Sequence, residues 1–227
     1  MSGIAHVLFD ADGVVQYVPG GWREAAGAHL GARTEEFLQR AWEEELPSFR
    51  GEGDYLPLLA AALEEYGVTV PIEEFYRDVW LRIARVEETF EVMAALRQAG
   101  YGVHLGTNQQ PGRARHMRTA LGYDGLFDVS CYSCELGVAK PDPGFFTEAA
   151  RRIGAAPEAI LFVDDNAANV EGARAAGLAA ELWRYDHGRV TLAEALAGHG
   201  VALPAGGEAA GGEAGGGEPA VGDGVSR

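Results

Sequence analysis

Acidic and hydroxyl-bearing residues follow apolar stretches of this sequence at three separate places. These residues are Asp10 and Asp12, Thr107 with Asn108, and Asp164 with Asp165. Carboxylates of this kind act as nucleophiles, as general acids and bases, and as ligands of hard cations. What they can do depends on whether the fold brings the three segments together.

A basic residue, Lys140, stands in the segment Val138-Ala-Lys-Pro-Asp-Pro. Asp142 has the type and position of a helix N-cap, and Pro143 suits the first helical turn. Pro141 keeps the preceding residue extended. Lys140 is therefore expected to project from a stiff loop just before a helix, where it could meet an anion. The alternative is a solvated surface lysine.

The elements around these residues alternate between strands and helices. The expected strands are nearly continuous apolar runs, at 4–9, 101–106, 127–132, 160–163 and 180–183. The expected helices, 90–99, 111–121, 145–153 and 167–176, each end at a glycine, the residue best suited to a left-handed helix stop. This order predicts an α/β fold with a doubly wound parallel sheet.

In such a sheet the carboxyl ends of the strands lie along one edge, where ligands bind. The four aspartates and Thr107 are then expected to share one small volume. Four carboxylates cannot remain ionised there without a cation, and Mg²⁺ prefers oxygen ligands of this type. The alternative is that each aspartate merely caps a turn, which is plausible for one of them but not for two pairs.

The chain between the first strand and residue 86 has a different pattern. It predicts consecutive helices without strands, at 22–30, 34–46, 55–66 and 72–84. We expect a core made of residues 1–17 and 87–203, with an inserted helical subdomain at 18–86. Residues 204–227, rich in Gly, Ala and Glu, are expected to be disordered.

Composition narrows the range of partners. The formal net charge of −16 argues against binding to nucleic acid or to an anionic membrane. No apolar run is long enough for a membrane helix, and the N-terminus lacks the features of a secretory signal, so the cytoplasm is the expected location. Cys131 and Cys134 lie in an apolar run and are expected to be buried strand residues rather than metal ligands or a redox pair. No pattern predicts an oligomeric state.

Four segments together resemble a known family. Phe9-Asp-Ala-Asp-Gly-Val, Gly106-Thr-Asn, Ala139-Lys-Pro-Asp-Pro and Phe162-Val-Asp-Asp are similar to the four motifs of the haloacid dehalogenase (HAD) superfamily, in that family's order. The resemblance covers nearly all of residues 4–186. It implies a Rossmann-like core, and the insertion after the first motif resembles the small helical cap of the family's phosphatase-like branch.

The resemblance also implies roles for individual residues. Asp10 would be the nucleophile that forms an aspartyl-phosphate, and Asp12 the general acid and then the general base. Thr107, Asn108 and Lys140 would bind the phosphorylated substrate. Asp164 and Asp165 would hold Mg²⁺ together with Asp10 and the backbone carbonyl of Asp12.

The resulting expectation is a magnesium-dependent phosphatase acting on a small phosphorylated metabolite. A phosphomutase or a dehalogenase of the same superfamily, or a binding module without activity, remain alternatives. Gln16, Tyr17 and Arg23 are candidates to face the leaving group. The aromatic residues of the insert are expected to form its core rather than line a pocket; they are Trp22, Trp42, Tyr55, Tyr76 and Trp80.

Overall fold

The structure, a computed structural model of the chain, describes residues 3–204. Its main sheet has five parallel strands in the order β5-β4-β1-β6-β7. The strands are β1 (His6–Phe9), β4 (Gly102–Thr107), β5 (Ser130–Tyr132), β6 (Ile160–Asp164) and β7 (Ala179–Leu182). The predicted doubly wound parallel sheet is confirmed. All of the predicted disordered tail except Pro204 lies outside the described residues.

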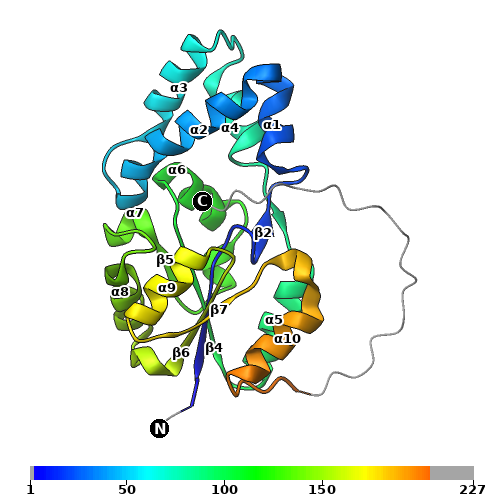
Figure 1. The fold of residues 1–227 in the computed structure, drawn as a ribbon, viewed down its shortest axis with the longest axis vertical. Helices are drawn as coiled ribbons and strands as arrows, with labels where there is room; N and C mark the ends of the chain where they lie inside the picture. The colour runs from blue at the N-terminus through cyan, green and yellow to red at the C-terminus, as the bar shows by residue number, and fades with distance from the viewer. Residues whose placement is uncertain (1–2, 205–227) are drawn as a thin grey trace, which may run out of the picture.

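Helices cover both faces of this sheet (Figure 1). On one face lie α5 (Glu87–Gln98), α6 (Pro111–Thr119) and α10 (Gly188–Gly198), whose apolar side chains share a cluster with Val7 and Phe9. On the other face lie α8 (Pro143–Ile153) and α9 (Ala167–Ala175), which pack around Leu8. Alternate residues of β1 thus enter opposite cores, which explains why the strand is apolar throughout.

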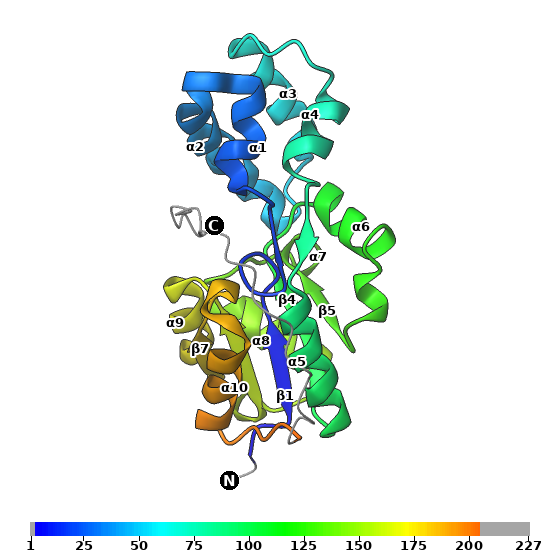
Figure 2. The ribbon, with the colours of Figure 1, turned by 90° about the vertical axis from the view of Figure 1, so that its right-hand side faces the viewer.

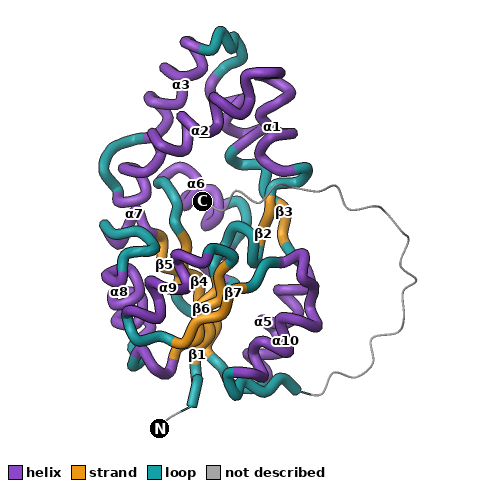
Figure 3. The backbone as a smooth tube through the Cα atoms, viewed as in Figure 1, coloured by secondary structure: helices purple, strands orange, loops and turns teal. Residues whose placement is uncertain are grey.

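The helices α1–α4 form a separate layer beyond the carboxyl ends of the strands (Figures 1 and 2). Their bounds are α1 (Gly21–Leu30), α2 (Thr34–Glu45), α3 (Tyr55–Glu65) and α4 (Ile72–Val79). We call residues 21–79 the helical insert. The chain enters and leaves it through a short antiparallel ribbon of β2 (Gln16–Tyr17) and β3 (Ala84–Arg85), which Figure 3 shows between the insert and the sheet. The domain boundaries at 17/18 and 86/87 stay a prediction.

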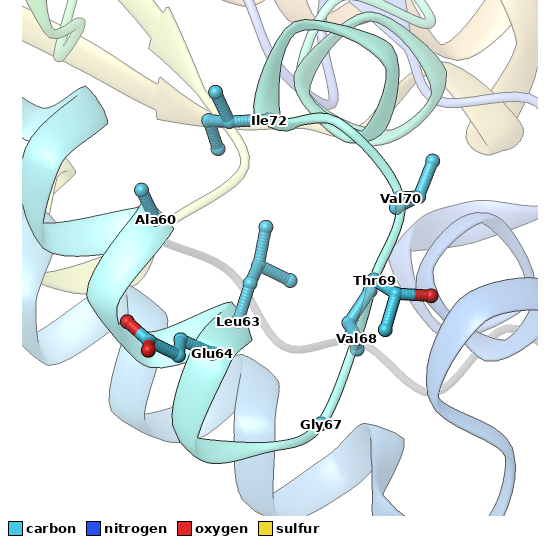
Figure 4. A pocket seen from close by; sticks show the side chains of 8 residues that line it. All are labelled: Ala60, Leu63, Glu64, Gly67, Val68, Thr69, Val70 and Ile72. Carbon is cyan, nitrogen blue, oxygen red and sulfur yellow. The ribbon is translucent and has the colours of Figure 1, made fainter.

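The insert has its own apolar core. Tyr55 and Trp80 are fully buried in it, Tyr76 is nearly so, and Trp22 and Trp42 pack partly buried against it. This agrees with the expectation that these aromatic residues are core residues. A hollow of about 350 Å³ lies between α3 and the segment that leads to α4, with Leu63 at its centre (Figure 4). It is at the end of the insert remote from the sheet.

Local structure differs from the sequence prediction in several places. The helix expected at 72–84 ends at Val79, because Ala84 and Arg85 pair with β2 instead. The strand expected at 127–132 is reduced to Ser130–Tyr132, while Phe127 reaches the core from a turn. The helix α10 was not predicted. At the first two places tertiary contacts override local propensity.

The two cysteines have different positions. Cys131 is buried in β5, as predicted, but Cys134 is half-buried in the short helix α7 (Ser133–Leu136), so the strand prediction was wrong for it. Burial raises the pKa of both thiols to about 11, which disfavours the reactive thiolate. Separately, within residues 3–204 no helix is both long and apolar enough to cross a membrane.

Candidate active site

Three carboxylates meet where β1 and β6 end. Phe9 and Val163 are register partners, so Asp10 follows β1 beside Asp164, the last residue of β6, and Asp165. One oxygen from each of the three aspartates lies within 4.8 Å of the others. Asp10 is 7% exposed and Asp164 is fully buried. Parallel pairing of strands far apart in sequence therefore creates the acidic cluster.

The Lys140 ammonium lies between two of these carboxylates. Its Nζ is 2.7 Å from Asp10 Oδ1 and 2.6 Å from Asp164 Oδ2. Burial by itself lowers the pKa of Lys140, but attraction to both carboxylates outweighs it and raises the pKa above its ordinary value. Lys140 is thus a buried cation within the site, not a surface lysine.

The carboxylates of this cluster disfavour one another's charge. Burial raises the pKa of Asp10 well above its ordinary value; Lys140 opposes this rise, while Asp164 and Asp165 add to it. Three carboxylates with oxygens this close repel one another, and a divalent cation bound among them would offset that repulsion. The donor set, carboxylate oxygens only, fits Mg²⁺ by its chemistry.

The side chain of Asn108 holds the loop of Lys140 by two hydrogen bonds to its backbone. Its Oδ1 accepts from the backbone N–H of Lys140 at 2.9 Å, and its Nδ2 donates to the backbone carbonyl of Lys140 at 2.9 Å. The peptide between Lys140 and Pro141 is cis. The side chain of Asn108 is therefore used to position Lys140, and substrate contact by Asn108 stays a prediction.

Asp164 has a further partner that the sequence analysis missed. Asn169 of α9 is buried, and its Nδ2 lies 3.1 Å from both carboxylate oxygens of Asp164. The backbone N–H of Asn166 also donates to Asp164, at 2.7 Å. A signal was available: Asn169 lies on the buried stripe of α9, where an amide needs a polar partner.

Asp12 is surrounded by nitrogen donors. Arg113 donates from Nη2 to Oδ1 at 2.7 Å and from Nη1 to Oδ2 at 2.5 Å. Gln16 Nε2 donates to Oδ1 at 3.1 Å, and Gln109 Nε2 donates to Oδ2 at 2.8 Å. Gln109 Nε2 also lies 3.1 Å from the hydroxyl of Thr107, so Thr107 joins the same network. The Asp12 side chain remains 23% exposed.

Of the three candidates for the leaving group, Gln16 contacts Asp12, a predicted site residue. Tyr17 stacks on Tyr185 with ring centroids 5.0 Å apart, and Arg23 pairs with Glu35 on the surface of the insert at 2.6 Å. Arg113 was missed entirely, although it shares the buried stripe of α6 with Ala114 and Met117. An arginine at such a position requires an acidic partner.

Gly13, which follows Asp12, leaves room for the side chain of Asp165. Its φ of +84° is unfavourable for other residues, and a Cβ there would lie 2.2 Å from Asp165 Oδ2. Asp165 thus packs directly against the backbone that follows Asp12.

Residues 4–177 match the family model described as haloacid dehalogenase-like hydrolase. The chain belongs to this family. Membership in the haloacid dehalogenase-like hydrolases confirms the family predicted from the four motifs, and it makes the cluster at the ends of β1, β4 and β6 the candidate active site of a hydrolase.

Several relatives in the family are phosphatases by name. A phosphoserine phosphatase of Thermus thermophilus is 35% identical over 109 residues, which are 48% of this chain and 43% of that protein. A glyceraldehyde 3-phosphate phosphatase of Methanopyrus kandleri is 32% identical over 40% of each chain. These two alignments span less than half of each relative. A phosphoglycolate phosphatase of Xylella fastidiosa is 29% identical over 79% of this chain and 80% of its own.

Solved structures of the family share the fold. A HAD family enzyme from Bacteroides thetaiotaomicron, in complex with magnesium and inorganic phosphate, matches with a TM-score of 0.70 at 19% identity, over 84% of this chain and 99% of that one. The L-2-haloacid dehalogenase of Xanthobacter autotrophicus matches with a TM-score of 0.61 at 22% identity, over 78% and 76%. Both matches confirm the predicted Rossmann-like fold.

Proposed function

We propose that the protein is a magnesium-dependent phosphatase that hydrolyses a small phosphorylated metabolite through an aspartyl-phosphate on Asp10. The observation that carries this proposal is the meeting of Asp10, Asp164 and Asp165 at the ends of β1 and β6, with the Lys140 ammonium bound to Asp10 and Asp164. The names of the relatives agree with phosphoester chemistry.

Asp10, Asp164, Asp165 and the backbone carbonyl of Asp12 would hold the Mg²⁺. When bound, the ion supplies positive charge that offsets repulsion between a carboxylate nucleophile and a phosphate dianion. Lys140 contributes a fixed positive charge to the same end, and the Thr107 hydroxyl would hydrogen-bond a phosphoryl oxygen.

Two displacements complete the reaction. In the first, a carboxylate oxygen of Asp10 forms a bond to phosphorus, the bond to the ester oxygen breaks, and that oxygen takes a proton from the Asp12 carboxylic acid. In the second, a water oxygen attacks phosphorus while the Asp12 carboxylate accepts its proton. The bond from Asp10 to phosphorus then breaks, releasing inorganic phosphate and restoring both aspartates.

The helical insert would act as a cap over this chemistry. It lies beyond the carboxyl ends of the strands (Figure 2), on the side where Asp10 follows β1 and Asp164 ends β6. A layer in this place can exclude water and select the leaving group. The division into a core of 1–17 and 87–203 and a cap of 18–86 is part of this proposal.

The test is a phosphate-release screen over common phosphorylated metabolites, with Mg²⁺ and with EDTA. The wild-type chain should release phosphate only with the metal, and Asp10→Asn should reduce turnover by about 10³-fold or more because it removes the nucleophile. Asp54→Asn is the matched control: Asp54 caps α3 in the insert, and asparagine caps equally well.

Several outcomes would contradict the proposal. Turnover that is indifferent to EDTA would exclude the metal, and full turnover by Asp10→Asn would exclude the nucleophile. Transfer of the phosphoryl group within a sugar phosphate, without release of phosphate, would indicate a mutase. Halide release from 2-chloropropionate without phosphatase activity would indicate a dehalogenase.

A further inference from the structure

Arg113 is a fully buried arginine at the junction of α6, Asp12 and the helical insert. Its two terminal nitrogens each donate to a different oxygen of Asp12, at 2.5 and 2.7 Å. A planar guanidinium that binds both oxygens fixes the plane of the carboxylate as well as its position. A single point charge such as an ammonium would not fix that plane.

The same guanidinium contacts the first turn of the insert and the residue that directly follows it. Its Nε donates to the backbone carbonyl of Trp80 at 2.8 Å, and its Cζ lies 5.2 Å from the ring centroid of Trp22. Trp22 is in the first turn of α1, and Trp80 directly follows α4. The orientation of Asp12 is thereby tied to the place where the insert meets the core.

A second contact at this junction does not involve Asp12. The hydroxyl oxygen of Tyr76 in α4 accepts a hydrogen bond from Nε2 of Gln110, the N-cap of α6. The insert is therefore held against α6 by one contact that reaches Asp12 and by one that does not. The two contacts can be removed separately.

We infer that Arg113 is a positioning residue that fixes the Asp12 carboxyl group relative to the helical insert, so that proton transfer at the leaving oxygen depends on the docked insert. This inference rests on the proposed function, because it takes Asp12 to be the proton donor. If Arg113 only filled its site, it would affect all substrates alike.

The experiment compares phenyl phosphate with p-nitrophenyl phosphate, two esters of similar shape. Phenolate is the poorer leaving group and needs the proton from Asp12 more. Arg113→Met should therefore reduce kcat on phenyl phosphate about 10-fold more than on p-nitrophenyl phosphate, a part of the 10²–10⁴-fold that general acid catalysis supplies. KM for both esters should change little, because Arg113 does not contact the phosphoryl group.

Three further variants sharpen the comparison. Tyr76→Phe loosens the same junction without touching Asp12, and it should affect both esters equally. Arg113→Lys keeps the positive charge but loses the pair of nitrogens that binds both oxygens of Asp12. It should reduce kcat on phenyl phosphate more than on p-nitrophenyl phosphate, by a smaller ratio than Arg113→Met. If a melting assay shows that Arg113→Met does not fold, Arg113→Lys replaces it in the comparison. Guanidinium ion at millimolar concentration should restore phenyl phosphate turnover to Arg113→Ala, and urea, its neutral analogue, should not.

Equal losses on the two esters for Arg113→Met and Arg113→Lys would overturn the positioning role, as would rescue by urea as good as that by guanidinium. The proposed function fails in a different way: with Mg²⁺ the wild-type chain would then release phosphate neither from these esters nor from the phosphorylated metabolites of the screen.

Discussion

Two aspartates that stand two residues apart in the chain have different surroundings. Asp10 is buried against an ammonium and other carboxylates, whereas Asp12 is partly exposed and bonded to a guanidinium and two amides. Different environments for neighbouring carboxyl groups are the usual means of giving them different tasks. Under the proposed function, one is the nucleophile and the other transfers protons.

At the scale of a single residue, Gly13 allows a prediction about Mg²⁺ binding. In Gly13→Ala the new Cβ would meet Asp165 Oδ2 at 2.2 Å, so Asp165 must move away from the cluster. The half-saturating Mg²⁺ concentration for turnover should rise about 10- to 100-fold, as it does when partners of metal ligands are displaced. The free energy of unfolding, measured in urea, should fall by about 1–3 kcal/mol because alanine is strained at this positive φ.

Gly100→Ala is the control for that strain. Gly100 also has a positive φ, +89°, but a Cβ there would meet nothing within 4 Å. It should lose comparable stability without any change in the response to Mg²⁺. An unchanged Mg²⁺ response in Gly13→Ala would refute the idea that Gly13 makes room for Asp165.

At the scale of elements, α9 supports the loop that carries Lys140. A Cβ on Gly172 would lie 2.1 Å from the carbonyl oxygen of Pro141 and 3.1 Å from Phe146. Gly172→Ala should therefore destabilise the protein by about 1–3 kcal/mol through overpacking, although alanine is the better helix former. Displacement of Lys140 should lower kcat by up to about 10²-fold.

Gly27→Ala is the matched control, because Gly27 is also inside a helix and has space. A Cβ there would have its nearest contact at 3.6 Å, with Thr34 Oγ1. This variant should gain about 0.5–1 kcal/mol and keep its activity. Urea unfolding and steady-state kinetics measure both variants, and a stabilised Gly172→Ala would show that the loop yields without cost.

The strand ends and their aspartates could be predicted because each follows from a local pattern, an apolar run that stops at a polar residue. The identity of the partners Arg113, Gln109 and Asn169 was missed. Arg113 and Asn169 come from helices and Gln109 from the loop before α6, and which side chain these segments turn toward the site depends on the tertiary structure. Their sequence signal, a polar residue on a buried helical stripe, shows for Arg113 and Asn169 that a partner is needed but not which one. The ribbon at Ala84–Arg85 was missed for the same reason, because only its pairing with Gln16–Tyr17 makes it a strand.

At the scale of the whole molecule, stability should depend on pH through His104 in the central sheet. This residue is 3% exposed, and burial together with His6, 3.1 Å away, lowers its pKa to about 4. The unfolded chain binds the proton near pH 6.5, so it holds more protons than the folded chain between about pH 4 and 6.5. Stability is therefore greatest above this window and falls as the pH drops through it.

The contribution of His104 to this loss should reach at most about 3 kcal/mol. Urea unfolding at pH 7.5 and pH 4.5 measures it, with His104→Gln as the comparison because glutamine does not titrate. The variant should lose less stability than the wild-type chain over the same interval. An identical loss in both would mean that His104 is charged in the folded state.

The central position of β1 in the sheet also affects when the active site can form during translation. Phe9, just before the nucleophile, has Leu105 and Val163 as its neighbours in the sheet. A nascent chain therefore displays Asp10 long before Lys140, Asp164 and Asp165 have been synthesised. Strand β1 cannot pair with β4 and β6 before these strands have been synthesised. The site that the hydrolase needs therefore forms late, once translation has passed β6.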